Sequence, residues 1–178
     1  DRLTMLKSRE WSDWVPIDFE SGIPGSSALD TVGVPASQPA MVRFFVKSVH
    51  PKFEMYASPI NIDPARPIVP ISTPTALTSE FANLHSRFYT LGIPEDTKAL
   101  SHGVLNEEEF LSQVDLVHEE RNKQYHHCLE QFDNGCLFFY WGSTDLVSHM
   151  FWRDRDPDHP GRDPKQGNRY VSVIDDLY

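Results

Sequence analysis

The chain has few cysteines, no long apolar run and fewer basic than acidic residues. Cys128 and Cys136 are its two cysteines among 178 residues, so the sequence carries neither a disulfide framework nor a Cys-x-x-Cys zinc knuckle. We expect two free thiols, with a bridge between them as the alternative. No stretch approaches the roughly 18 apolar residues of a membrane span. Disulfide-rich and membrane-spanning classes are therefore excluded.

The charge balance restricts the partners. Lysine and arginine number 16 against 26 aspartates and glutamates, and the formal net charge is −10. The acidic residues are dispersed along the chain, whereas a protein that binds a phosphate backbone needs a positive surface. A nucleic-acid polymer is therefore excluded as a partner. The length predicts one domain, or one domain with an appendage, with enough residues for a core.

Proline divides the sequence into two differently built halves. Ten of the 14 prolines lie between residues 16 and 74, and none lies between 95 and 156. Short segments rich in aromatic and β-branched residues in the first half predict a small antiparallel sheet. The expected strands are 14–19, 41–49 and 53–57, with a hairpin turn at 48–52, a long surface loop at 20–39 and an extended proline-rich run at 58–74.

The second half has helical periodicity. Residues 80–91 predict a helix that ends at Gly92 as its C-cap. Residues 106–132 predict a longer helix with three glutamates in its first turn, where carboxylates favour the helix dipole. The run 136–141 (CLFFYW) is typical of a strand covered on both faces in a parallel sheet, and a helix is expected at 145–152. Strand, turn and helix in succession predict an α/β fold.

The polar residues that follow this expected strand are the candidate site. Ligand sites in open α/β sheets lie beyond the carboxyl ends of the strands, and Ser143, Thr144, Asp145 and His149 occupy that place. Because Asp145 and His149 are four residues apart, they share one helix face and can bind the same zinc or other transition metal. A catalytic zinc needs three protein ligands, so a third must come from elsewhere. The alternative is a helix cap, Asp145, with His149 as its partner.

The segment Phe138 to Arg153 (FFYWGSTDLVSHMFWR) resembles the Asp-x-x-x-His segment of the alkaline phosphatase superfamily, in particular its type I phosphodiesterase/nucleotide pyrophosphatase-like branch. Residues 10–19, 58–74 and 88–100 look like parts of the same branch. The resemblance covers most of the chain and is most specific from Ser143 to Arg153.

This resemblance implies a two-zinc hydrolase of small phosphate esters, a phosphodiesterase or phosphatase, on a central, mostly parallel sheet; manganese is the alternative metal. In that superfamily the Asp and His of the motif bind one zinc with a later histidine, so Asp145 and His149 carry over as metal ligands. Ser143 and Thr144 are expected to cap the helix or to orient Asp145. Asp96 and Thr97 are candidate substrate-pocket residues, with a capped helix start as the alternative.

The superfamily's nucleophile and its Ser-Asp-His-Gly motif have no counterpart here, and the chain starts at Asp1 without an initiator methionine. We therefore expect an internal piece of a longer enzyme, inactive by itself, whose fold class is α/β or, as a fragment, α+β. Residues 1–77 would form a small antiparallel insertion, and residues 78–178 a helical and α/β portion of the catalytic domain that carries the Asp-x-x-x-His motif. The other interpretation is a non-catalytic binding or interaction domain in which Asp145 and His149 are only a helix cap and its partner.

Overall fold

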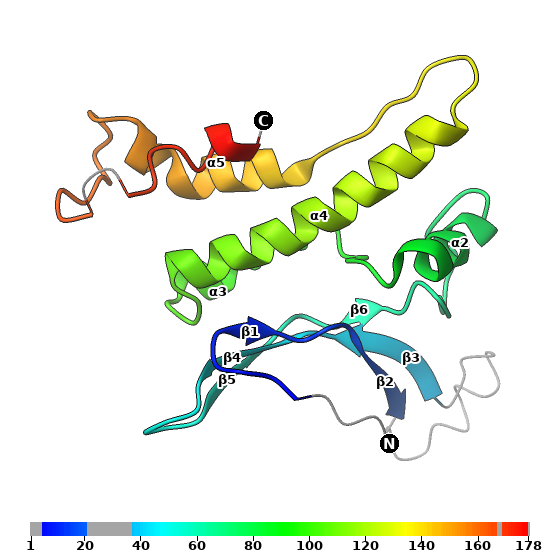
Figure 1. The fold of residues 1–178 in the computed structure, drawn as a ribbon, viewed down its shortest axis with the longest axis horizontal. Helices are drawn as coiled ribbons and strands as arrows, with labels where there is room; N and C mark the ends of the chain where they lie inside the picture. Colours follow the sequence, from blue (N-terminus) through cyan, green and yellow to red (C-terminus); the bar gives the residue numbers. More distant parts are fainter. Residues whose placement is uncertain (1–4, 21–36, 167–168, 178) are drawn as a thin grey trace, which may run out of the picture. The chain divides into compact units, whose positions relative to one another are not determined.

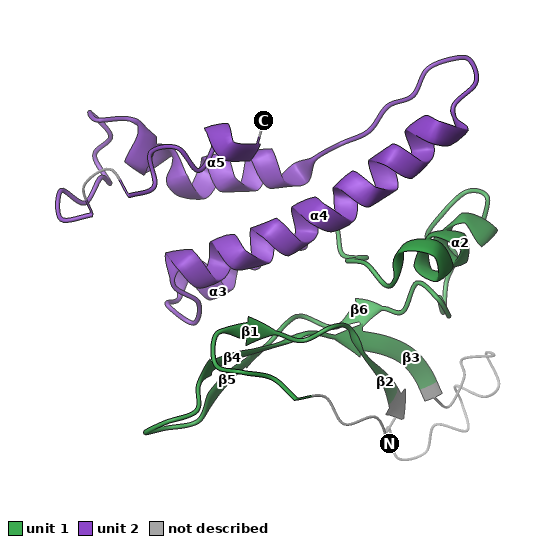
Figure 2. Cartoon of the chain, in the orientation of Figure 1, with its two compact units in different colours: residues 1–92 green, residues 93–178 purple. Residues whose placement is uncertain are grey.

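The computed structural model describes residues 5–20, 37–166 and 169–177, which form a mixed α/β structure with two small antiparallel sheets (Figure 1). The chain folds as two compact units, residues 1–92 and residues 93–178 (Figure 2). These two units are defined by the contacts between residues of the chain. The division expected at residue 77 separates an insertion from a portion of a catalytic domain, and it stays a prediction.

The first unit contains the strands. They are β1 (Glu10–Trp11), β2 (Val15–Glu20), β3 (Ser37–Val42), β4 (Phe44–Ser48), β5 (Glu54–Ala57) and β6 (Asn61–Ile62). One sheet has the order β1-β4-β5 and the other β2-β3-β6, and all pairs are antiparallel. The antiparallel prediction is confirmed, as is the hairpin between β4 and β5. The expected loop at 20–39 falls mostly outside the described residues, and its last three residues belong to β3.

The single strand expected at 41–49 is two strands, because the chain changes sheets at Arg43. The backbone N–H of Arg43 donates to the hydroxyl of Ser58 at 3.0 Å, and its carbonyl accepts from the Ser58 N–H at 2.8 Å. The Arg43 guanidinium is buried over the ring of Trp14, at 4.8 Å from the centroid, and over that of Tyr89, at 5.7 Å. The position of the break between β3 and β4 is therefore determined by contacts of Arg43 with residues distant in the sequence.

The helix expected at 80–91 is α2 (Ala76–His85), which begins and ends earlier than predicted. Ser86 has a φ of 72°, which stops the helix. Beyond it, the side-chain oxygen of Asn61 accepts hydrogen bonds from the N–H groups of Thr90, at 2.9 Å, and Leu91, at 3.2 Å. These bonds hold the segment in a non-helical path, so Gly92 caps no helix. The run at 58–74 contains no helix, as predicted, but it is not extended throughout: only β6 is a strand, and the chain turns where the Arg66 N–H donates to the Asp63 carbonyl at 3.0 Å.

The second unit contains α3 (Thr97–Ser101), α4 (Glu107–Gln131), α5 (Gly142–Arg155) and the short 3-10 helix η1 (Asp175–Leu177). The long helix predicted at 106–132 is confirmed as α4. Asn106 and Glu109 form a capping box: the Asn106 side chain accepts from the Glu109 N–H, and the Glu109 carboxylate accepts from the Asn106 N–H, both at 2.9 Å. The helix expected at 145–152 is longer, since α5 starts at Gly142.

Replacing Asn106 with alanine is expected to lower the free energy of unfolding of the second unit by about 1 kcal/mol. The substitution leaves the Glu109 N–H without its acceptor at the start of α4. Urea denaturation followed by far-ultraviolet circular dichroism measures the change. Gln131→Ala, at the exposed last position of α4, is the matched control and should change stability by less than about 0.5 kcal/mol. Equal stabilities of Asn106→Ala and wild type would contradict the capping role.

The run 136–141, expected as a strand, is extended but pairs with no strand among the described residues (Figure 1). Its residues alternate: Phe138 and Tyr140 are 84% and 63% exposed, whereas Phe139 and Trp141 pack on Tyr125 of α4, with ring centroids 5.5 and 4.6 Å apart. A strand exists only where a neighbour pairs with its backbone groups. The parallel sheet is therefore absent from the described part of the chain.

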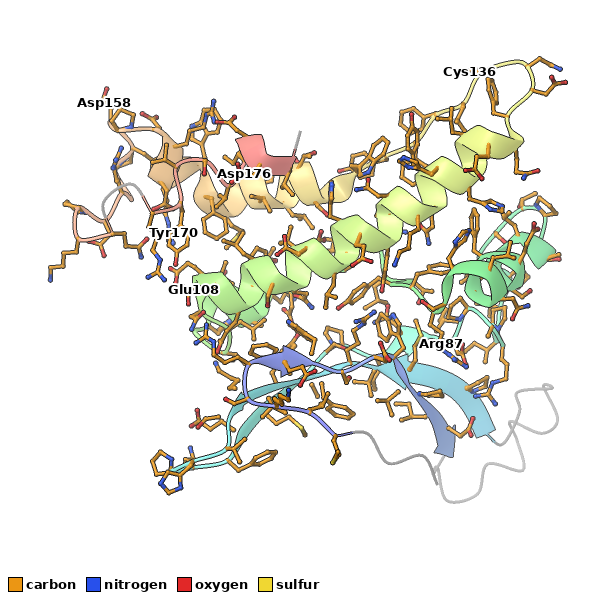
Figure 3. The ribbon with its side chains drawn as sticks, in the orientation of Figure 1. Arg87, Glu108, Cys136, Asp158, Tyr170 and Asp176 are labelled. Atoms are coloured by element: carbon orange, nitrogen blue, oxygen red, sulfur yellow. The ribbon has the colours of Figure 1, made fainter. Side chains whose placement is uncertain are left out.

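The core of the second unit lies between α4, α5 and the C-terminal segment. Its buried residues are Phe110, Val114, Val147, Phe151, Tyr170 and Ile174. Figure 3 labels Tyr170, in the segment that returns beside α5 after the loop of Asp158. Within the described ranges, no helix has the length and apolar character needed to span a membrane.

Both cysteines are free thiols, as predicted. Cys136 is exposed in the connection between α4 and α5 (Figure 3). Cys128 is half-buried on α4, and burial raises the pKa of its thiol.

Candidate functional site

Asp145 and His149 meet on the exposed side of α5, as their spacing predicts. One helical turn separates them, and the Oδ1 of Asp145 lies 3.4 Å from the Nε2 of His149. Both side chains face solvent, since they are 56% and 74% exposed. The separation exceeds the usual hydrogen-bond distance of about 2.9 Å. The two atoms are therefore close neighbours without a well-formed hydrogen bond.

The same separation suits two ligands of one metal ion. Zinc binds imidazole nitrogen and carboxylate oxygen at about 2.0–2.2 Å, and two such ligands at the corners of a tetrahedron lie about 3.3 Å apart. Across residues 5–20, 37–166 and 169–177, no cluster of three or more His, Cys, Asp or Glu side chains is placed to bind a metal. The donor set therefore fits part of a zinc site and lacks a third ligand.

Asp145 does not cap α5, because the helix begins three residues before it. Trp141 is the N-cap residue and makes no side-chain capping bond. Thr144 donates its hydroxyl hydrogen bond to the Trp141 carbonyl at 3.0 Å. The interpretation of Asp145 as a cap is therefore wrong, and so is the expectation that Ser143 or Thr144 caps the helix.

Ser143 instead binds a residue that no sequence pattern singles out. Its hydroxyl donates to Oε1 of Glu95, which lies in the loop before α3. Glu95 is 0% exposed, and its second carboxyl oxygen, Oε2, has no hydrogen-bond partner in the described structure. No local pattern marks Glu95 in the sequence, because the contact that buries it spans 48 residues.

The electrostatics of Glu95 combine opposing effects. Burial raises the pKa of its carboxyl group above the ordinary value, although the Ser143 hydrogen bond lowers it in part. Arg121 and His118, both on α4, also favour the charged form. The Nδ1 of His118 is buried and without a hydrogen-bond partner among the described atoms. A partly satisfied polar group thus lies under the first turn of α5.

Asp96 and Thr97, the candidate substrate-pocket residues, begin α3. The Asp96 carboxylate accepts a hydrogen bond from the Ala99 N–H at 2.8 Å and is the N-cap. Thr97 is the first residue of the helix. The expected helix start is confirmed, and the substrate role of the two residues stays a prediction.

A cavity of about 530 Å³ opens beside the start of α5. It is lined by His118, Asn122, Tyr140, Trp141, Thr144, Asp176 and Leu177. The Trp141 indole N–H donates to the side-chain oxygen of Asn122 at 3.0 Å, which fixes one wall on α4. Because Thr144 precedes Asp145, the cavity reaches the turn that carries the first candidate ligand. Its size is in the range of small-molecule sites.

α5 thus carries an exposed carboxylate and imidazole one turn apart, Asp145 and His149. Thr144 in its first turn lines a cavity, and the buried carboxyl group of Glu95 binds Ser143 in the same turn. Comparison of the chain with protein-family models, with curated proteins and with solved structures finds no match.

Proposed function

We propose that this chain is part of a metal-dependent phosphoric-ester hydrolase of the alkaline phosphatase superfamily, in which Asp145 and His149 bind one zinc ion. The observation that carries the proposal is the 3.4 Å separation of the Asp145 carboxylate and His149 imidazole on an exposed helix face. It is supported by the position of Asp145 inside α5, where the residue has no capping task. The substrate is a small phosphate ester.

The exposed aromatic residues of 136–141 support the proposal that this segment belongs to a mostly parallel sheet in the larger enzyme. Phe138 is 84% exposed, and the segment has no paired strand within the described residues. In the proposed enzyme this segment is a strand of a mostly parallel sheet, whose neighbours pair with its backbone and cover Phe138 and Tyr140. The remaining ligands, including those of a second zinc, belong to that larger domain.

Asp145 and His149 have distinct tasks in this proposal. The carboxylate contributes negative charge and the imidazole a neutral nitrogen, and the rigid helix keeps the two donors on one face. A zinc ion held by these two residues would supply Lewis-acid stabilisation of the charge that develops on the leaving-group oxygen and would activate water. Manganese is the alternative metal.

His149→Ala is expected to lower the hydrolysis of bis(4-nitrophenyl) phosphate by the intact protein by about a hundredfold or more, because even outer residues of metal sites are worth about 10–100-fold. His126→Ala is the matched control: it removes an exposed histidine of the same unit, on α4, and should leave the rate within about twofold of wild type.

Unchanged hydrolysis in His149→Ala would contradict the enzymatic proposal. Asp145 and His149 would then be an ion pair on the surface of a binding or interaction domain. A loss of rate in both histidine variants would also contradict it, because the effect would not be specific to α5.

A further inference from the structure

The first turn of α5 is tied to a loop that is distant in the sequence. The bond from the Ser143 hydroxyl to the Glu95 carboxyl group is shielded from solvent, since the two residues are 2% and 0% exposed. No side chain caps the N-terminus of α5. The Ser143–Glu95 bond instead joins the first turn of the helix to the loop before α3, in the same unit. A carboxyl group beside the first turn also interacts favourably with the helix dipole when it is charged.

Glu95 is itself held in place by α4. The backbone N–H of the next residue, Asp96, donates to Oε1 of Gln113 at 2.9 Å, and Gln113 is fully buried. The Asp96 side chain caps α3, which fixes the other side of the loop. The carboxyl group of Glu95 therefore stands at a defined place between α4 and α5.

Asp145 lies two residues after Ser143, within the same helical turn. A displacement of that turn moves the Asp145 carboxylate relative to any ligand from outside the helix. We infer that Glu95 is a positioning residue for the metal site: through Ser143 it fixes the first turn of α5 and the direction in which Asp145 and His149 face. The inference rests on the proposed function. Residues that orient metal ligands in this way typically change metal affinity by about 10–100-fold.

The test compares Glu95→Ala with Glu95→Gln in the intact protein. Alanine removes the acceptor of the Ser143 hydroxyl, whereas glutamine keeps an oxygen that can accept it. We expect Glu95→Ala to weaken zinc binding about 10–100-fold in a chelator competition and to change the visible absorption spectrum of the Co²⁺-substituted protein. Glu95→Gln should stay within about threefold of wild type and restore the spectrum.

Two further variants separate positioning from stability. Ser143→Ala removes the same hydrogen bond from the α5 side and should weaken zinc binding as Glu95→Ala does, which keeps the test decisive where the glutamate variant does not fold. Glu109→Ala removes a buried glutamate of the α4 capping box and should leave zinc affinity unchanged.

The outcomes distinguish the two proposals. If His149→Ala abolishes metal binding but the Glu95 and Ser143 variants bind zinc as wild type does, the positioning role is wrong and the hydrolase proposal stands. If Glu109→Ala weakens zinc binding as much as Glu95→Ala, the effect is one of stability and the positioning role is again wrong. If His149→Ala changes nothing, the proposed function itself fails.

Discussion

Replacing Phe151 with alanine is expected to lower the free energy of unfolding of residues 93–178 by about 3–5 kcal/mol. Phe151 is 0% exposed, and its ring lies 6.2 Å from that of Phe110 on α4 and 5.4 Å from that of Tyr170. It therefore joins three segments of the unit. Truncation removes the buried apolar surface and leaves a cavity that the helices can only partly close.

The effect of Phe151→Ala is measured by urea denaturation followed by far-ultraviolet circular dichroism, because α4 and α5 hold most of the helical residues. Trp152→Ala is the matched control. Trp152 is the next residue on α5 but is 50% exposed, so its truncation should cost less than about 1 kcal/mol. Similar losses for the two variants would show that the core does not lie where the structure places it.

Asp63→Asn is expected to destabilise the first unit by about 2–4 kcal/mol at neutral pH. The Asp63 carboxylate is fully buried and accepts two hydrogen bonds from Arg87, from Nε at 2.9 Å and from Nη2 at 3.1 Å. The pair ties the end of β6 to the segment after α2, and Figure 3 labels Arg87 at this place. The neutral amide leaves the guanidinium, 31% exposed, without its buried anion.

The cost of Asp63→Asn should depend on pH. Burial acts to raise the pKa of Asp63, but hydrogen bonds from Arg87 and from the Ala65 N–H outweigh it and hold that pKa below the ordinary value of 3.8. A carboxyl group with a lowered folded-state pKa stabilises the fold above its unfolded-state pKa and loses this contribution as the pH falls through its folded-state pKa. The difference between the two proteins should therefore be full at pH 7 and shrink below about pH 4.

Hydrogen exchange of the amides in β4, β5 and residues 86–91 measures this difference within the first unit. Asp18→Asn is the control, because Asp18 is 57% exposed and pairs with Arg66 at 3.5 Å on the surface. It should change protection by less than about 0.5 kcal/mol at either pH. A cost of Asp63→Asn that does not fall with pH would contradict the assignment of Asp63 as a charged, buried anchor.

Local signals predicted local structure well. The length and cap of α4 follow from its periodicity and from the Asn106–Glu109 capping box, all within neighbouring turns. The break at Arg43 could not be predicted, because Ser58 lies 15 residues away. The non-helical path of the segment after α2 depends in the same way on Asn61, which binds Thr90 across 29 residues. The strand expected at 136–141 needs a partner strand that no local pattern can supply.

In the candidate site, too, contacts between residues close in the sequence could be predicted and contacts between distant residues could not. The approach of Asp145 and His149 follows from their spacing on a helix, so the sequence sufficed to predict it. The partner of Ser143 did not follow, because Glu95 lies 48 residues earlier in a loop without periodicity. The resemblance predicts its neighbours Asp96 and Thr97 as substrate-pocket residues, and in the structure they are the N-cap and the first residue of α3.

The metal content of the intact protein, purified without chelators, tests the central proposal most directly. Elemental analysis by mass spectrometry should find zinc, or manganese in its place, at about two ions per chain in the wild type, with at least one ion lost in His149→Ala. Wild-type protein that contains neither metal, or His149→Ala protein that retains the full amount, would contradict the assignment of Asp145 and His149 as metal ligands.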